Sequence, residues 1–413
     1  MSISRFVITG VTLSGNMGGA AMLSAALQQL RRRYPGARFQ LLSIYPEADR
    51  AIGGDSDLEI IDARPLRLLA WYMPLTLLAG LGEWLRRSLA RRSPFFRAIA
   101  AADAVIDLSG IAFVDKRGLP LLWYNLSCAL PGIVWGKPVF KLSQALGPFR
   151  TFSNRLAARL LLPRCAAVIA RGEQSRQFLV ELGMRDAEAL PDVSFAMNIP
   201  PEIEAEAQAC FRNLGARERP WIVVSPSQVV SRLCQKRGID FLGQMTAFVE
   251  ALLERYDVNV LILPHSLGTG ASKNNDIDLC RHLYVNLQTH AQVYMHVPRH
   301  DPVLLRALIG QADFFIGCRF HAVVAALIMC VPTLILGWSH KYREMAQGFN
   351  ADIPSMDFAN FSKDALTDMF DSAWQCRVAT RERLVNNGPA VKAAAIRNFD
   401  IVERHLGAPY ARH

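Results

Sequence analysis

The stretch from Ala312 to Ser339, "ADFFIGCRFHAVVAALIMCVPTLILGWS", contains the pattern that decides the fold. Its first residues, "ADFFIG", predict a buried strand that ends at Gly317, and "HAVVAALIMCV" predicts a helix packed against that strand. The run "VPTLILGWS" predicts the next strand. A strand, a helix and another strand in this order indicate a parallel sheet, whose strands are apolar throughout because helices cover both faces.

Short apolar runs followed by small or polar residues recur along the whole chain. In the N-terminal half they occupy residues 5–9, 38–44, 104–110, 138–148, 166–175 and 187–195, with a helix expected at 20–33. In the C-terminal half they also occupy 219–227, 258–266 and 291–297, with helices expected at 240–255 and 302–310. We therefore predict an α/β protein of two Rossmann-like, doubly wound domains, residues 1–200 and 201–413, facing a cleft at the carboxyl ends of their strands.

The charge of the chain favours anionic partners. Lysine and arginine number 46 against 36 acidic residues, which gives a net charge of +10. A basic excess attracts phosphate-bearing ligands and membrane surfaces but does not by itself indicate nucleic acid, and we expect no nucleic acid partner.

Cysteines and histidines do not form a metal-binding pattern. The eight cysteines are scattered without a C-x-x-C pair, and His282, His290, His296 and His300 share no spacing. The N-terminus "MSISRFVITG" lacks the long apolar region and the cleavage site of a signal peptide. We expect no metal site, reduced thiols and a cytoplasmic location, with the inner face of the cytoplasmic membrane as an alternative.

Residues 63–97 differ from the rest of the chain, because apolar and aromatic runs alternate there with seven arginines. The uncharged run Leu68 to Gly82 is about five residues too short to span a bilayer. Trp71 and Trp84 beside flanking arginines suit a helix or helical hairpin in the membrane interface. The alternative is a core or inter-domain helix with a solvated basic edge.

Arg319 and His321 lie at the predicted strand-to-helix turn of the opening stretch. A helix N-terminus offers unpaired N–H groups and a partial positive charge to an anion. An arginine adds a planar fork for phosphate or carboxylate, and a histidine adds a proton donor near neutral pH. The alternative is that Arg319 caps a neighbouring element and His321 is a core histidine.

The same residues resemble the signature of the polysaccharide pyruvyl transferase family. That signature has an R-x-H-A turn, a small-residue helix, V-P and a lysine after the next strand, as in "GCRFHAVVAALIMCVPTLILGWSHK". Further family-like loops are "SGNMGGAAML" (14–23), "QALGPF" (144–149), "ARGEQS" (170–175) and "LPDVSF" (190–195). The chain departs from the family at Gly19 and Gly172, where acidic residues are usual, and at "DLSG" (107–110).

The resemblance implies a GT-B-like architecture and transfer of a pyruvyl group from phosphoenolpyruvate to two hydroxyls of a sugar, forming a ketal. The acceptor would be a sugar of a cell-surface or exopolysaccharide precursor, including a lipid-linked oligosaccharide. Phosphoenolpyruvate would be a co-substrate, with no further cofactor. His321 is carried over as the acid that protonates the methylene carbon, and Arg319 as a catalytic cation.

Four residues are candidates for binding the donor. Arg319 and Lys341 would contact its phosphate or carboxylate. His265, in "LPHS", would reach the same cleft, or it is an ordinary loop histidine. Arg232 could add a phosphate contact, or it belongs to a solvated basic loop.

Four further residues are candidates for binding the acceptor. Asn16, Gly18 and Gly19 form a loop whose backbone could approach a ligand closely, and Gln144 can both donate to and accept from sugar hydroxyls. The alternative for the glycine-rich loop is a tight strand-to-helix turn. Two other functions stay open: a GT-B glycosyltransferase that uses a nucleotide sugar, and a non-catalytic member of an envelope-polysaccharide assembly.

Overall fold

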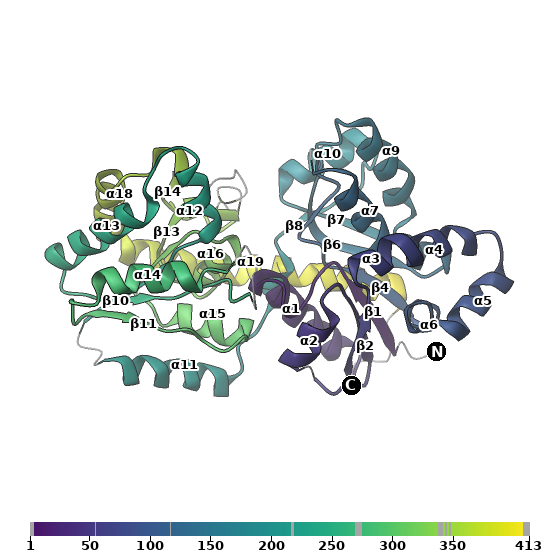
Figure 1. Ribbon diagram of the computed structural model, residues 1–413, viewed down its shortest axis with the longest axis horizontal. Coiled ribbons are helices and arrows are strands. Elements are labelled where there is room, and N and C mark those ends of the chain that lie inside the picture. Colours follow the sequence, from purple (N-terminus) through teal and green to yellow (C-terminus); the bar gives the residue numbers. More distant parts are fainter. Residues whose placement is uncertain are drawn as a thin grey trace. The chain divides into compact units, whose positions relative to one another are not determined.

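The computed structural model describes residues 4–53, 55–115, 117–215, 219–268, 275–337, 342, 345–346 and 348–407. The chain forms two compact units. Unit 1 comprises Met1–Gly15, Met22–Met197 and Ala393–His413, and unit 2 comprises Asn16–Ala21 and Asn198–Lys392. Each unit is built on one parallel sheet (Figure 1).

The sheet of unit 1 has the strand order β3-β2-β1-β4-β6-β7-β8, and β5 pairs with β6. Its strands are β1 Arg5–Thr9, β2 Arg38–Ser43, β3 Leu58–Asp62, β4 Ala104–Asp107, β5 Ile111–Ala112, β6 Val139–Leu146, β7 Ala167–Arg171 and β8 Ala189–Leu190. The direction in which strands are added reverses between β1 and β4, as in Rossmann folds.

The sheet of unit 2 has the order β11-β10-β9-β12-β13-β14, which is the same Rossmann pattern with its reversal between β9 and β12. Its strands are β9 Trp221–Ser225, β10 Asn259–Ile262, β11 Val293–Met295, β12 Phe314–Gly317, β13 Thr333–Gly337 and β14 Ser355–Asp357. Each strand in this sheet pairs in parallel with its neighbour.

Helices connect the strands of both units. Those within unit 1 are α2 Pro46–Ile52, α3 Pro65–Arg67, η1 Leu68–Tyr72, α4 Met73–Ala79, α5 Glu83–Arg92, α6 Pro94–Ala101, α7 Leu119–Ser127, α8 Leu130–Val134, α9 Phe152–Leu161, η2 Leu162–Arg164, α10 Glu173–Leu182 and η3 Val193–Ala196. Those within unit 2 are α11 Pro201–Leu214, α12 Gln228–Gln235, α13 Phe241–Arg255, α14 Ile277–Leu287, α15 Pro302–Gly310, α16 Phe320–Ile328, η4 Phe358–Asn360 and α18 Lys363–Gln375. Helix α1, Met17–Arg33, begins in unit 2 and continues in unit 1, and α19, Arg377–Leu406, runs from unit 2 into unit 1.

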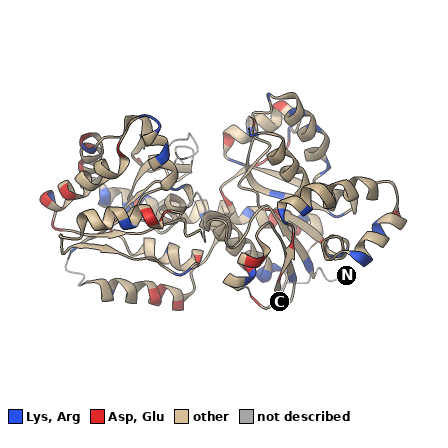
Figure 2. Ribbon diagram, viewed as in Figure 1, with Lys and Arg blue, Asp and Glu red and all other residues tan. Residues whose placement is uncertain are grey.

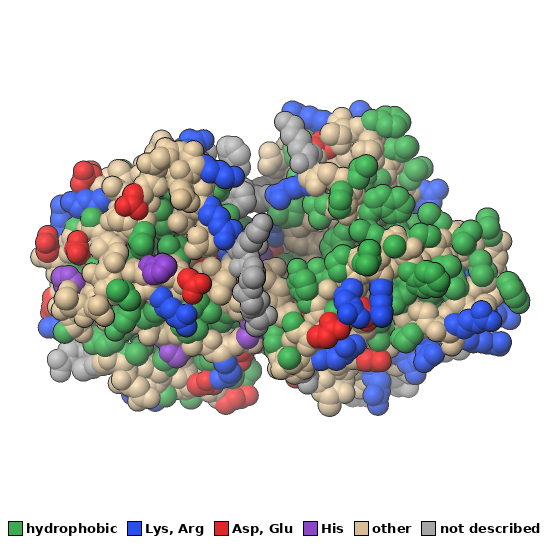
Figure 3. Space-filling view, viewed as in Figure 1, with side chains coloured by type: hydrophobic (Ala, Val, Ile, Leu, Met, Phe, Trp, Pro, Cys, Tyr) green, Lys and Arg blue, Asp and Glu red, His purple; other side chains and the backbone are tan. Residues whose placement is uncertain are grey.

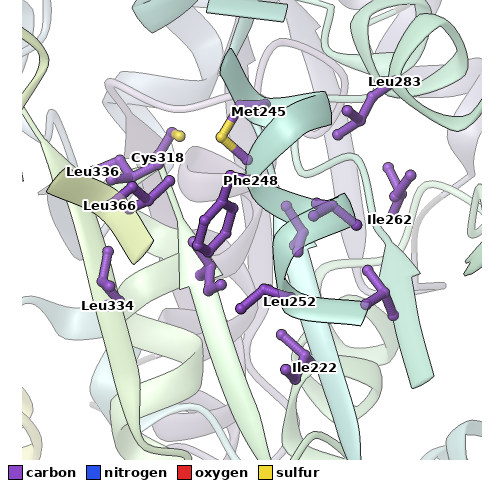
Figure 4. Close-up of a cluster of buried hydrophobic side chains, with 14 of the residues drawn as sticks. Ile222, Met245, Phe248, Leu252, Ile262, Leu283, Cys318, Leu334, Leu336 and Leu366 are labelled. Atoms are coloured by element: carbon purple, nitrogen blue, oxygen red, sulfur yellow. The ribbon is translucent and has the colours of Figure 1, made fainter. Parts of the chain in front are cut away.

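The central strands are apolar because both faces of each sheet are covered. Every residue of β9, β10, β12 and β13 is buried, so a continuous apolar run is the sequence signature of this sheet. Figure 4 shows part of the resulting core, in which Phe248 and Leu252 of α13 lie among Ile222, Ile262 and Leu334 of the strands.

The structure divides the chain differently from the predicted boundary in two places. Residues 16–21 belong to unit 2, because Gly18 packs against His321. The end of α19 belongs to unit 1, where Ser143 Oγ donates to Asn398 Oδ1 over 2.7 Å and Arg33 pairs with Asp400. The predicted C-terminal domain comprised residues 201–413, but the structure assigns Ala393–His413 to unit 1.

Residues 63–97 form a continuous helical run from Pro65 to Ala79, followed by two further helices. Helices α3, η1 and α4 are followed by a turn at Gly80–Gly82, after which α5 and α6 continue. Leu68, Tyr72 and Met73 are buried, whereas Trp71 and Trp84 are exposed. None of the helices in the described part of the chain combines the length and the apolar character needed to cross a bilayer.

Candidate active site

Arg319 and His321 lie where the sequence places them, at the turn between a central strand and a helix. Strand β12 ends at Gly317, Arg319 is the N-cap residue of α16, and His321 is in the first turn of that helix. The turn follows the carboxyl end of β12, next to β9, where the strand order reverses. Ligands of doubly wound folds bind at this position.

A buried carboxylate holds the guanidinium of Arg319. Nε and Nη2 of Arg319 donate to the two carboxylate oxygens of Asp276 at 2.9 and 2.6 Å. The same carboxylate accepts hydrogen bonds from the backbone N–H groups of Gln228 and Ser266, both at 2.9 Å. Arg319 therefore binds a neighbouring element, as the alternative interpretation expected, and its contact with a donor stays a prediction.

His321 packs directly against the N-terminus of α1. A Cβ atom added to Gly18 would lie 2.1 Å from Nδ1 of His321, so any side chain at this position would displace the imidazole. Asn16, the residue before α1, accepts a hydrogen bond from Gly19 N–H on its Oδ1 over 2.7 Å. The first turns of α1 and α16 thus meet at the imidazole, and each contributes the partial positive charge of a helix N-terminus.

Asn16, Gly18 and Gly19, predicted to bind the acceptor, lie in a different unit from the one expected. These residues lie in unit 2 beside His321, not in the first domain. The Asn16 side chain caps its own helix, so this loop has the tight-turn character considered as the alternative. Acceptor binding by the loop stays a prediction.

His265 and Arg306 complete the cluster. They line a small cavity together with His321 and the residues Met17, Ala21, Pro302, Leu305 and Ala325. His265 follows β10 and is 7% exposed, while Arg306 lies within α15 and is 3% exposed. The cavity has a volume of about 10 Å³, which is close to the space that one water needs. A substrate would have to widen it.

Arg306 was not among the site residues predicted from the sequence, although one signal for it was present. Arg306 is the lone charge in the otherwise apolar helix "PVLLRALIG", and a buried charge requires compensation that a functional site often supplies. Arg232 lies in the last turn of α12 and is not among the residues that line the cavity. Lys341 lies outside the described residues.

Gln144 lies in the interior of unit 1. It is completely buried on β6, and its Nε2 donates to the backbone oxygen of Asp107 over 3.0 Å. Asp107 also forms a wholly buried ion pair with Lys141 and accepts a 2.6 Å hydrogen bond from the Ser109 hydroxyl. Gln144 thus has a structural contact at the carboxyl end of the sheet, and its contact with an acceptor sugar stays a prediction.

Burial holds the pKa of His265 well below its ordinary value, and nearby His321, Arg319 and Arg306 lower this pKa further. The folded protein therefore keeps His265 neutral, whereas the unfolded chain protonates it below about pH 6.5. Because the unfolded state then binds more protons, the free energy of unfolding must fall as the pH decreases from that value.

We expect the folded protein to lose about 1.4 kcal/mol of stability through His265 between pH 7.5 and 5.5. Urea unfolding of the wild type and of His265→Asn at both pH values measures this contribution. The free energy of unfolding of the variant should change less between the two pH values, because the variant lacks His265. Some change should remain, because other groups, such as His296, titrate in both proteins. If His265→Asn lost as much stability as the wild type between the two pH values, His265 would not be the source of this contribution.

Comparison with solved structures identifies the fold. The chain is similar to a putative UDP-N-acetylglucosamine 2-epimerase from Listeria monocytogenes, with a TM-score of 0.59, 13% identity and 99% coverage of both chains. It is equally similar in TM-score, 0.59, to the UDP-GlcNAc 2-epimerase from Neisseria meningitidis bound to UDP-GlcNAc, with 11% identity and coverage of 97% of this chain and 100% of that one. These likenesses confirm the prediction of a GT-B-like α/β fold with two Rossmann-like domains.

The comparison with family models goes further than the fold. The model described as polysaccharide pyruvyl transferase matches residues 16–340, which include the loop around Gly18, His265, Arg306 and the Arg319–His321 turn. The match extends over most of the 413 residues and confirms the resemblance seen in the motifs. The chain therefore belongs to the polysaccharide pyruvyl transferase family.

Proposed function

We propose that the protein transfers the pyruvyl group of phosphoenolpyruvate to two hydroxyls of a sugar, forming a ketal and releasing phosphate. The observation that carries this proposal is the meeting of two helix N-termini at His321, beside Arg319 and Arg306. The acceptor we propose is a sugar of a cell-surface or exopolysaccharide precursor, free or lipid-linked.

The charges at the site suit a donor with two anionic groups. Phosphoenolpyruvate carries a phosphate and a carboxylate, and the N-termini of α1 and α16 each favour a negative group. Arg319 and Arg306 add two permanent positive charges, which Asp276 offsets in part. A dianionic or trianionic ligand in this position would be stabilised by both arginines and by both helix ends.

The proposed reaction begins with a proton transfer from the imidazolium of His321 to the methylene carbon of the donor. The central carbon becomes electrophilic and forms a bond to one sugar hydroxyl, whose proton passes to the imidazole of His321, now neutral. The bond between this carbon and the phosphate oxygen then breaks, and the second hydroxyl adds in its place. One hydroxyl proton is finally found on the new methyl group and the other on the released phosphate, so the reaction balances.

The test is incubation of the purified protein with phosphoenolpyruvate or UDP-sugars and a panel of glycan acceptors. We expect phosphate release from phosphoenolpyruvate in a one-to-one ratio with ketal formation, measured by a phosphate assay and mass spectrometry. Release of UDP from a UDP-sugar, without phosphoenolpyruvate consumption, would instead support the glycosyltransferase alternative. Turnover of neither donor with any acceptor would favour a non-catalytic role.

A further inference from the structure

Large apolar side chains are exposed mainly on unit 1. In the described part of unit 1, the exposed large apolar residues between 66 and 160 are Leu66, Trp71, Leu77, Leu78, Leu81, Trp84, Ile111, Leu119, Trp123, Phe152, Leu156 and Leu160. In the described part of unit 2 they are the valines Val285, Val297, Val378 and Val385. Soluble surfaces rarely gather so many leucines and aromatic residues, which are typical of interaction sites.

These residues lie on neighbouring helices. Helix α7 contacts both η1 and α9, and α4 contacts both η1 and α5, which connects the exposed residues into one region. Figure 3 shows hydrophobic side chains over the part of unit 1 in which Figure 1 labels α3, α4, α7 and α9. We call the exposed side chains of α3, η1, α4, α5, α7 and α9, together with Leu81 of the turn between α4 and α5, the apolar–basic face.

Arginines accompany the apolar residues on this face. Residues 63–97 and 150–164 together contain eleven arginines and one acidic residue, Glu83. Figure 2 shows the basic residues along α5. Glu83 is paired with Arg87, whereas Arg91 and Arg92 have no ion-pair partner among the residues that the structure describes. Arg64 and Arg67 pair with Asp62, so the face combines apolar area with positive charge that is compensated only in part.

A surface pocket brings both features together. It has a volume of about 500 Å³ and is lined by Leu66, Arg67, Trp71 and Arg92, among others. Trp71 is 62% exposed and Leu66 is 80% exposed. An indole at the boundary between water and acyl chains, with guanidinium groups level with the lipid phosphates, is the arrangement favoured at a membrane interface.

We propose that the apolar–basic face binds the surface of a membrane that contains anionic lipids, without crossing it. Charge complementarity selects this partner, because acidic headgroups compensate the arginines while the acyl chains cover the leucines and tryptophans. A second copy of the chain would bring an identical positive surface against the first, and such like charges repel. This inference is independent of the proposed function, since it concerns binding and not turnover.

The test is co-sedimentation of the full chain with vesicles of phosphatidylcholine, with and without 30% phosphatidylglycerol. We expect binding to the anionic vesicles that weakens as salt is raised from about 0.1 to 0.5 M. Changing Arg91 and Arg92 to glutamine should lower the partition coefficient by about 30-fold, from the contribution of two arginines near an anionic surface. Changing Leu81 and Trp84 to serine should also weaken binding.

The matched control carries Val285→Ser and Arg383→Gln, which alter an exposed apolar and a basic residue of unit 2. It should bind like the wild type, and circular dichroism should show that all variants are folded. Failure of the wild type to bind anionic vesicles, or equal binding with and without phosphatidylglycerol, would overturn the proposal. So would a concentration-dependent dimer that the Leu81→Ser, Trp84→Ser variant abolishes, because the face would then be a contact between copies.

Discussion

Replacing His321 with alanine is expected to lower the rate of pyruvyl transfer by about 100-fold or more while the protein stays folded. A positioned general acid contributes roughly this factor or more to a rate. The side chain lies in the first turn of α16 and lines the cavity beside His265. Its loss removes the proposed proton donor but leaves the strands of the sheet unchanged. Single-turnover assays with phosphoenolpyruvate, together with circular dichroism, measure both effects.

Gly18→Ala tests the position of the His321 imidazole without replacing His321 itself. The added methyl would lie 2.1 Å from Nδ1 of His321, which forces the ring or the loop to move. Gly388→Ala is the matched control, because its methyl would meet Cys330 Sγ at 3.9 Å, an ordinary contact distance. We expect a loss of activity in Gly18→Ala and none in Gly388→Ala. Near wild-type turnover in folded His321→Ala would refute the acid role.

The central strands of both sheets and the edge strands β8 and β11 fall in runs predicted from the sequence, but the edge strands β3 and β14 do not. Strands β9 and β12 are continuous apolar runs because they are buried on both faces. Strand β3, "LEIID", and strand β14, "SMD", lie at sheet edges, where residues such as Glu59 and Asp357 are exposed. These two edge strands are short and carry charges that discourage further pairing, so neither has the long apolar run that marks the central strands.

The turn that carries Arg319 and His321 was predictable because it is local in the sequence. Its contacts with Gly18 and Asp276 were not predictable, since these residues come from distant segments and no spacing links them to the turn. Gly18 lies in the opposite half of the chain from His321, and Asp276 precedes α14 without capping that helix. An aspartate before an apolar helix predicts a cap, yet this carboxylate binds Gln228, Ser266 and Arg319 instead.

Asp276→Ala is expected to lower the free energy of unfolding by about 3–5 kcal/mol, which is typical when one partner of a buried ion pair is removed. Asp276 is completely buried, and the side chain of Arg319 is 20% exposed. The substitution leaves the guanidinium and two backbone N–H groups without this acceptor. Urea unfolding measures the change. Asp278→Ala, at an exposed position two residues further along, is the control and should cost less than about 1 kcal/mol.

The same ion pair separates a structural role of Arg319 from a role in binding the donor. Lysine retains the charge but cannot make the two parallel hydrogen bonds that Arg319 makes to Asp276. If Arg319 only holds Asp276, Arg319→Lys should reduce stability and leave the KM for phosphoenolpyruvate unchanged in the folded fraction. We expect instead that KM for phosphoenolpyruvate rises strongly while acceptor affinity is retained, because the guanidinium lies at the helix N-terminus where the donor's anionic groups would bind. A change confined to acceptor affinity would move Arg319 from the donor site to the sugar site.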